Sequence, residues 1–404
     1  MHKALKHKFR QLSAAETRAK LEITYALTPQ KVIYILRAAN SGSTQSQAKL
    51  ATEILEKDPD IGYAVGIRQA AVARVPWDIV PPEGNNSAEA LSVAKDIRRA
   101  VKDILPHPRT GLSSMSNLIL ELQSALLPGY AVSQINWKPA GAGINGFGYV
   151  AQEHFTFGNS LWPRLVRSGK EAEELSEDGW IVHRHLPRPG DLARGGLVRP
   201  LAYLYIFKNM MFKDYLRYLE KFGMPHLAVH ADQATIDEMG DNLEDLMENW
   251  AADGSAVFPT GVNLNITEAS KNSLDVYGLF LNQVRKWVDR LVIGQDSTGS
   301  AENSNRSTAN VHYQVKHEIL EGDCAATEDT INIQVLRPLT YFRHGPQAPV
   351  PRLKMRCEPP KDLAEWATII KTMGEAGHEV EDQEQINKLF GMKFRRTAQN
   401  EVAK

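Results

Sequence analysis

Two histidines, His183 and His185, come closest in this sequence to side chains whose type and spacing could do chemistry. They stand in the run GWIVHRHL, which predicts an extended strand, and residues two apart on a strand point to the same side. Two imidazoles so placed can chelate a transition metal. No carboxylate stands nearby in the sequence, so two interpretations remain: structural or surface histidines, or the metal site of a nucleic-acid enzyme.

Other signatures of catalysis are missing from the sequence. His317 begins HEIL, half of the zinc motif H-E-x-x-H, and no second histidine follows. There is no G-x-x-x-x-G-K-[ST] loop for a nucleotide and no G-x-S-x-G elbow for a serine nucleophile. Cys324 and Cys357 are too few for a disulfide framework or a zinc site, and they indicate synthesis in a reducing cytosol. The motifs therefore favour a protein without cofactor, metal or catalysis.

Acidic side chains gather in one segment. Between Ala231 and Ser270 the chain carries nine carboxylates and no Lys or Arg, although the net charge of the whole chain is only −1. The segment has two interpretations: the solvated face of an amphipathic helix, or a docking surface for a basic partner. Six of these carboxylates share the predicted helix: Asp237, Glu238, Asp241, Glu244, Asp245 and Glu248. The near-neutral chain argues against tight binding of nucleic acid over its whole surface.

Two long amphipathic helices must hold this acidic segment. Apolar spacing predicts one helix from Pro200 to Phe222 and a second from Asn272 to Ile293. Before them, capped helices alternate with three strand-like runs, GYAVSQINWKP, YVAQEHFTFG and GWIVHRHLPRPG. The predicted class is therefore α+β and helix-rich.

A polar stretch follows the second long helix. From Gly294 to Asn310 no apolar side chain is larger than alanine, which is typical of a functional loop or of a linker. A helix of about thirty residues is then expected from Ser307, stopped by Pro338. FRHGPQAPVPRLKMRCEPP is expected to be an extended linker, and a helical pair and a basic tail follow it. No apolar run is long enough to span a bilayer, and the basic N-terminal residues lack the apolar core of an export signal.

Several blocks together resemble the portal proteins of tailed bacteriophages, specifically the Mu-like branch. The likeness begins in LTPQKVIYILRAANSG, KDPDIGYAVGIR and PWDIVPP. It continues through LLPGYAVSQINW, FKDYLRYLEKFGMPHLAVH and VFPTGVNLNI to LVIGQDSTGS and STANVH. These blocks cover most of residues 27–345 in order, and the order carries the resemblance more than any single block.

The resemblance implies a portal fold assembled into a ring, typically of twelve subunits. Carried onto this chain, it assigns 1–26 to an N-terminal arm, 27–199 to an α+β wing, 200–223 to a first stem helix, 224–270 to a clip, 271–293 to a second stem helix, 294–306 to a tunnel loop, 307–345 to a long channel-wall helix, 346–360 to a linker and 361–404 to a crown and C-terminal tail.

The resemblance also implies a structural, non-catalytic role at one capsid vertex of the virion, after assembly in the cytoplasm of a bacterial host. Double-stranded DNA would be packaged and ejected through the ring without sequence-specific contacts. The implied partners are further copies of the chain, the large subunit of a terminase that hydrolyses ATP, the major capsid protein and a head–tail adaptor or neck protein. No membrane partner is implied.

Three sets of residues receive roles from the resemblance. The tunnel loop would touch a moving duplex without gripping it, through Gln295, Asp296, Ser297, Thr298, Ser300, Glu302, Asn303, Asn305 and Arg306. The six acidic side chains of the predicted clip helix would form its docking surface. The stem cations Lys213, Arg217, Arg285, Lys286 and Arg290 would make sparse phosphate contacts, or else serve as ordinary surface cations or in salt bridges between subunits. Two alternatives to a portal stay open: a metal-dependent nucleic-acid enzyme using His183 and His185, or another head-morphogenesis adaptor.

Overall fold

The computed structural model describes residues 27–141, 143–158, 162–167, 171–187, 189–190, 192–222, 226–230, 234, 263–267, 271–295, 306–357, 363–376, 384 and 386–387. The chain divides into two compact units, residues 1–355 and 356–404. The second unit contains helix α12, Leu363–Glu375. The predicted N-terminal arm lies outside the described residues, as do the second helix of the predicted crown pair, apart from three residues, and the basic tail.

Three consecutive helices open the first unit: α2 (Pro29–Asn40), α3 (Gln45–Lys57) and α4 (Pro59–Ala73). Side chains cap two of them, because Thr28 accepts a hydrogen bond from the Lys31 amide and Asp58 accepts from the amides of Asp60 and Ile61. Proline stands in the first turn of both capped helices, where its missing N–H costs nothing. Residues 27–73 therefore form a compact helical layer, followed later by α5 (Ala88–Lys102) and α6 (Met115–Leu122), which continues as a 3-10 turn over Gln123–Leu126.

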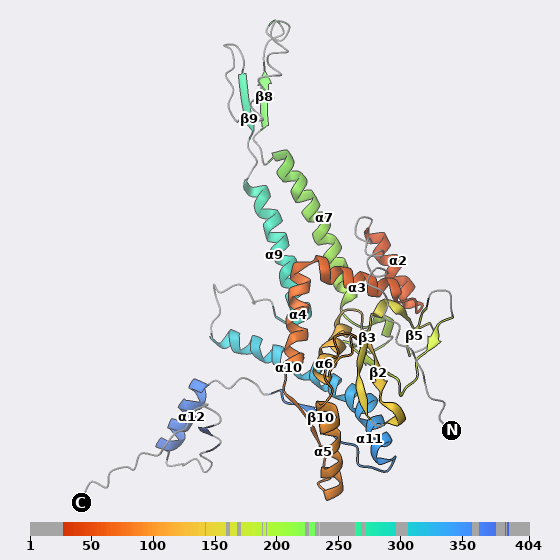
Figure 1. Ribbon diagram of the computed structural model, residues 1–404. Helices are drawn as coiled ribbons and strands as arrows, with labels where there is room; N and C mark the ends of the chain where they lie inside the picture. Colours follow the sequence, from red (N-terminus) through yellow and green to blue (C-terminus); the bar gives the residue numbers. More distant parts are fainter. Residues whose placement is uncertain are drawn as a thin grey trace, which may run out of the picture. The chain divides into compact units, whose positions relative to one another are not determined.

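A three-stranded antiparallel sheet has the strand order β3-β2-β7. Its strands β2 and β3 lie beside α6 (Figure 1). Two of the three predicted strand runs are confirmed, as β2 (Tyr130–Trp137) and β7 (Trp180–Arg184). The run YVAQEHFTFG was wrong as a single strand, because it divides between the end of β3 (Ile144–Val150), a 3-10 turn and the two-residue β4 (Phe155–Thr156). Two further short strands, Arg164–Leu165 (β5) and Glu173–Glu174 (β6), pair beside β4.

Glycines explain why β3 did not read as a strand in the sequence. A Cβ on Gly146 would lie only 2.8 Å from the Cβ of Leu112. The backbone of β3 passes this closely because Ser113 and Phe147 exchange backbone hydrogen bonds in an isolated bridge. Glycine within a strand often marks such a close approach.

The predicted linker 346–360 was wrong in its central part. Residues Arg352–Met355 form strand β10, which pairs antiparallel with β1 (Trp77–Val80). Leu353 is fully buried there, and its backbone N–H and C=O both bond the side-chain amide of Asn332. The segment is therefore part of the first unit.

The long helix after the polar stretch does not stop at Pro338, which corrects the prediction. Helix α10 (Arg306–Ile331) passes through a π-helical turn (Asn332–Leu336) into α11 (Arg337–His344). The turn resets the hydrogen-bond ladder, so Pro338 falls in the first turn of α11, where no backbone donor is needed. The turn also directs Gln334 at the backbone N–H and C=O of Val182 on β7.

The first unit also contains two long helices, α7 (Val198–Phe222) and α9 (Lys271–Ile293), which lie side by side (Figure 1). Between them in the chain stand β8 (His226–His230) and β9 (Asn263–Thr267), paired antiparallel. Among the helices that the structure describes, none has the length and apolar character to cross a bilayer.

Candidate functional site

The N-terminal half of α7 and the C-terminal half of α9 are part of the core of the first unit. Leu201, Tyr205 and Ile206 of α7 are buried with Val288 and Val292 of α9. The same hydrophobic cluster includes side chains of α2, α3 and α4. The helical pair is therefore held rigidly at its base, by apolar packing of the kind that dominates folding free energy.

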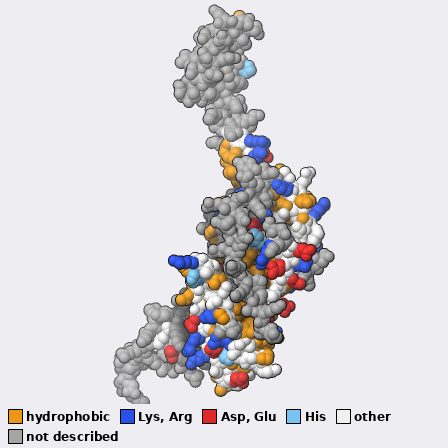
Figure 2. Space-filling model, turned by 45° about the vertical axis from the view of Figure 1, so that its right-hand side comes forward, with side chains coloured by type: hydrophobic (Ala, Val, Ile, Leu, Met, Phe, Trp, Pro, Cys, Tyr) orange, Lys and Arg blue, Asp and Glu red, His pale blue; other side chains and the backbone are white. Residues whose placement is uncertain are grey.

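The same two helices also leave large apolar side chains in water. Leu279 is 68% exposed and Val276 is 60% exposed. The further exposed apolar side chains of the pair are Tyr203, Phe207, Met210, Phe212, Leu216 and Trp287. Figure 2 shows hydrophobic side chains beside Lys and Arg at the upper end of the described surface. Exposed apolar side chains gathered on one pair of helices are typical of an interface with another protein.

Aromatic rings join the two helices where core packing has ended. Tyr277 of α9 lies 5.3 Å from Tyr215 and 5.9 Å from Tyr218 of α7, measured between ring centroids. Such ring pairs add about 0.5 to 1.5 kcal/mol beyond the area they bury. The two helices therefore stay paired beyond the core, and their exposed apolar side chains remain uncovered.

Two cations anchor α7 to the helical layer. Lys208 lies 2.8 Å from Asp58 and 2.6 Å from Asp60, at the capped start of α4. Arg199 donates to the side chain of Asn40 and to the backbone carbonyls of Leu36 and Ala193. These contacts fix the angle at which α7 leaves the core. Sequence patterns do not reveal the contacts with Leu36, Asn40, Asp58 and Asp60, because those partners are about 150 to 160 residues away.

The five predicted phosphate-contacting cations all lie on exposed positions of the two helices: Lys213, Arg217, Arg285, Lys286 and Arg290. The structure therefore brings them to one helical pair. Arg217 lies 3.9 Å from Asp214, an exposed ion pair that contributes at most about 1 kcal/mol.

The chain passes from α9 into the polar stretch at a tightly packed glycine. Gly294 has φ of +80°, and a Cβ there would lie 2.6 Å from Ile319 Cδ1 and 2.9 Å from Val315 Cγ1 of α10. Only glycine allows both the left-handed backbone and this approach. The predicted tunnel loop ends one residue earlier than expected, because Arg306 is already the first residue of α10. Gln295 is described and half-buried, and residues 296–305 lie outside the described part.

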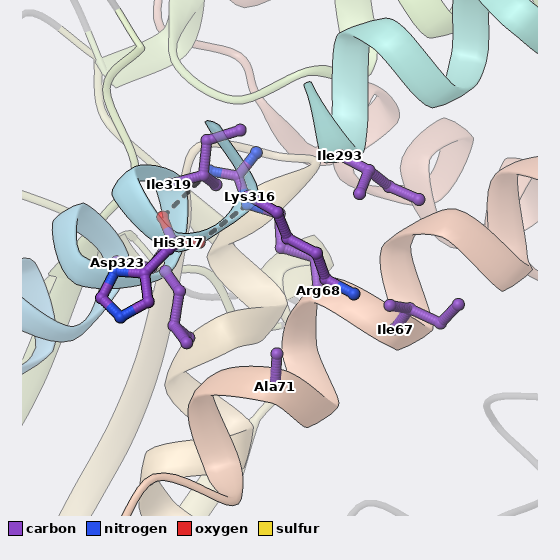
Figure 3. Close-up of a pocket in the computed structure, with 9 residues that line it drawn as sticks. Ile67, Arg68, Ala71, Ile293, Lys316, His317, Ile319 and Asp323 are labelled. Carbon is purple, nitrogen blue, oxygen red and sulfur yellow. Dashed lines mark hydrogen bonds and ion pairs between the residues drawn. The ribbon is translucent and has the colours of Figure 1, made fainter. Parts of the chain in front are cut away.

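A buried ion pair lies next to the C-terminal end of α9. Arg68 of α4 donates to both carboxylate oxygens of Asp323 on α10, at 2.7 and 2.9 Å, and to the backbone carbonyl of Val292 at 2.9 Å. A cavity of about 140 Å³ opens beside the pair (Figure 3). Its lining residues are Ile67, Arg68, Ala71, Ile293, Lys316, His317, Ile319, Leu320 and Asp323.

His183 and His185 both lie against helix α10. His183 Nδ1 lies 2.8 Å from the hydroxyl of Thr330, and His185 Nδ1 lies 3.9 Å from Asp323, whose carboxylate already binds Arg68. Burial lowers the pKa of His183 to about 4; burial and the charge of Arg68 lower that of His185 to about 4. Within the described ranges no group of three or more His, Cys, Asp or Glu could hold a metal ion. The geometry gives the metal-site hypothesis no support.

The six predicted docking carboxylates lie outside the described residues: Asp237, Glu238, Asp241, Glu244, Asp245 and Glu248. Sequence reasoning also missed Arg68 and Asp323, which are 255 residues apart and carry no motif.

Comparisons with known proteins agree with one another. The model of the family described as the portal protein of Mu bacteriophage matches residues 48–392. The chain is 26% identical over 379 residues to the Mu-like prophage FluMu protein gp29 of Haemophilus influenzae, covering 90% of this chain and 70% of that protein. It is 24% identical over 349 residues to the portal protein of Escherichia phage Mu, covering 85% of this chain and 66% of that protein.

A solved structure shares the fold. It is described as the neck of an empty GTA particle computed with C6 symmetry, and the match has a TM-score of 0.55 at 14% identity. The match covers 84% of this chain and 91% of that chain. The α+β, helix-rich portal fold expected from the sequence is therefore confirmed.

Proposed function

Because this chain belongs to the portal protein family of Mu bacteriophage, we propose that it forms a ring at one capsid vertex through which double-stranded DNA is packaged and ejected. The family is structural and not enzymatic, so the chain is a portal connector, and the alternatives of a metal-dependent enzyme or another head adaptor are set aside. The chain spans 70% and 66% of the two curated relatives.

The observation that carries this proposal is the helical pair α7 and α9, which is buried at its base and exposes large apolar side chains on both helices. A ring uses heterologous contacts, in which one face of a subunit meets a different face of its neighbour. Exposed apolar side chains on both helices supply such a face. A ring of twelve is compatible with the sixfold symmetry in the description of the similar neck structure.

The remaining assignments follow from this arrangement. Chain order supports the assignment of α7 and α9 as the two stem helices, of 224–270 as the clip and of the polar stretch after α9 as the tunnel loop. The exposed cations Lys213, Arg285 and Lys286 fit sparse, sequence-independent phosphate contacts or salt bridges between neighbouring subunits. The acidic segment between the stem helices fits a docking surface for transient partners.

The partners of such a ring are proposed from the same family membership. A terminase large subunit would dock during packaging and supply ATP hydrolysis, and a head–tail adaptor or neck protein would dock afterwards. The major capsid protein would surround the wing. The mature location is the virion, after assembly in the bacterial cytoplasm.

Shortening the polar stretch tests this function. Removal of Gly299–Asn305 takes away no apolar side chain larger than alanine and leaves α7 and α9 intact, so subunits should still assemble into rings. We expect particles made with this variant to contain less DNA, because the channel would lose its contact with the duplex. Normal DNA content per particle, measured on purified heads, would return the stretch to the role of a linker.

A further inference from the structure

The guanidinium of Arg68 ties three helices together at one point. Its Nε and one terminal nitrogen bind the two oxygens of Asp323 on α10 (Figure 3). Its other terminal nitrogen binds the carbonyl of Val292 on α9. Arg68 itself belongs to α4. Both charged side chains are nearly buried, with 14% and 10% of their surfaces exposed. Water therefore competes little with these contacts.

The carbonyl that Arg68 binds is one that α9 cannot satisfy itself. The last four carbonyls of a helix have no intrahelical partner, and the C-terminal end of a helix favours a nearby cation. Val292 stands one residue before the end of α9, so its carbonyl is among these four. Arginine suits this position because its planar fork can bind a carboxylate with two nitrogens and still reach a third acceptor, which a lysine ammonium cannot do in one geometry.

The end of α9 also packs directly on α10. Gly294 packs directly on Ile319 and Val315 of α10, so closely that a Cβ could not fit. The cavity of about 140 Å³ lies along the same junction, between Ala71 of α4 and Lys316 of α10. Side-chain packing is therefore incomplete there, and the hydrogen bonds of Arg68 add a directional link between α4 and the end of α9 to the apolar packing that already joins the two helices.

We infer that Arg68 is the positioning residue that fixes where the chain leaves α9, with Asp323 holding its guanidinium in place. The inference rests on the proposed function only in its consequence, since this exit point sets where the proposed tunnel loop starts. In a ring, the same contact repeated in each subunit would give every loop the same origin. It also links the wing helix α4 to α9 and α10 on the two sides of the loop.

Hydrogen exchange at the end of α9 tests the inference. The amide of Gly294 donates to the carbonyl of Arg290 at 3.1 Å, so it reports directly on the last turn. In Arg68→Lys we expect this amide and that of Ile293 to exchange about tenfold faster or more, because local opening becomes easier. The matched control is Arg343→Lys, since Arg343 binds Asp96 through the same two-nitrogen fork, far from α9 in the chain. That variant should leave α9 unchanged.

The outcomes separate positioning from general support. Exchange within twofold of wild type at Ile293 and Gly294 in Arg68→Lys overturns the inference. Equal acceleration in strand β2 also overturns it, because Arg68 would then support the whole unit rather than one helix end. Should Arg68→Lys fail to fold, Asp323→Asn is measured by the same criterion. The experiment uses the full chain without DNA, so its result stands even if the proposed channel function fails; DNA content of particles carrying the variant then tests the consequence.

Discussion

Replacing Leu279 by aspartate should prevent ring assembly without unfolding the subunit. Leu279 is 68% exposed on α9, and in the proposed ring a neighbouring subunit would cover it. Fully burying a leucine contributes about 1.5 to 3 kcal/mol, and the exposed part corresponds to about 1 to 2 kcal/mol per interface. Aspartate loses this gain and adds several kcal/mol for burying an unpaired charge. Closing a ring sums these costs over every interface.

The assay is sedimentation velocity at matched protein concentration, with circular dichroism to verify that the variant is folded. We expect Leu279→Asp to sediment mainly as a free subunit, whereas the wild type sediments as a large assembly. Leu105→Asp is the control, since Leu105 is 75% exposed and lies outside the helical pair. A folded Leu279→Asp chain that assembles as fully as the wild type would refute the assignment of this face to the interface.

Three further predictions concern stability. Lowering the pH from about 6.5 to about 4 should destabilise the fold, because His183 and His185 have pKa values of about 4 in the folded chain and bind protons at higher pH in the unfolded chain. The melting temperature should fall over this range, and a melting temperature independent of pH would contradict the prediction. Gly294→Ala should lower the free energy of unfolding by about 1 to 3 kcal/mol, and by more than Gly84→Ala. Both glycines have positive φ, but only a Cβ at Gly294 would collide with neighbouring atoms. Equal denaturation midpoints of the two variants would contradict this prediction. Lys208→Met should cost about 3 to 5 kcal/mol by leaving a buried carboxylate unpaired, and an unchanged melting temperature would count against the anchoring role.

Local patterns were enough to predict the elements that matter most for function. The observed α7 and α9 begin within two residues of the predicted helices and end where expected, because apolar periodicity and flanking Gly and Pro act over a few residues. The family resemblance then supplied the order of parts that composition alone could not.

Long-range partners explain what the sequence did not reveal. Strand β10 is four residues long and becomes a strand only by pairing with β1, about 275 positions earlier. Pro338 reads as a helix stop unless the preceding π-turn is known, and that turn is held by side-chain amides that reach Leu353 and Val182. The Arg68–Asp323 pair is likewise a product of the folded topology, since its two residues carry no local signal.

The most direct test of the account is electron cryo-microscopy of the purified full-length chain. The account predicts a closed ring with an axial channel, with α7 and α9 of each subunit side by side and their exposed apolar side chains covered by neighbours. A stable monomer at the same concentration, or an assembly in which Leu279 and Val276 remain in contact with solvent, would contradict it.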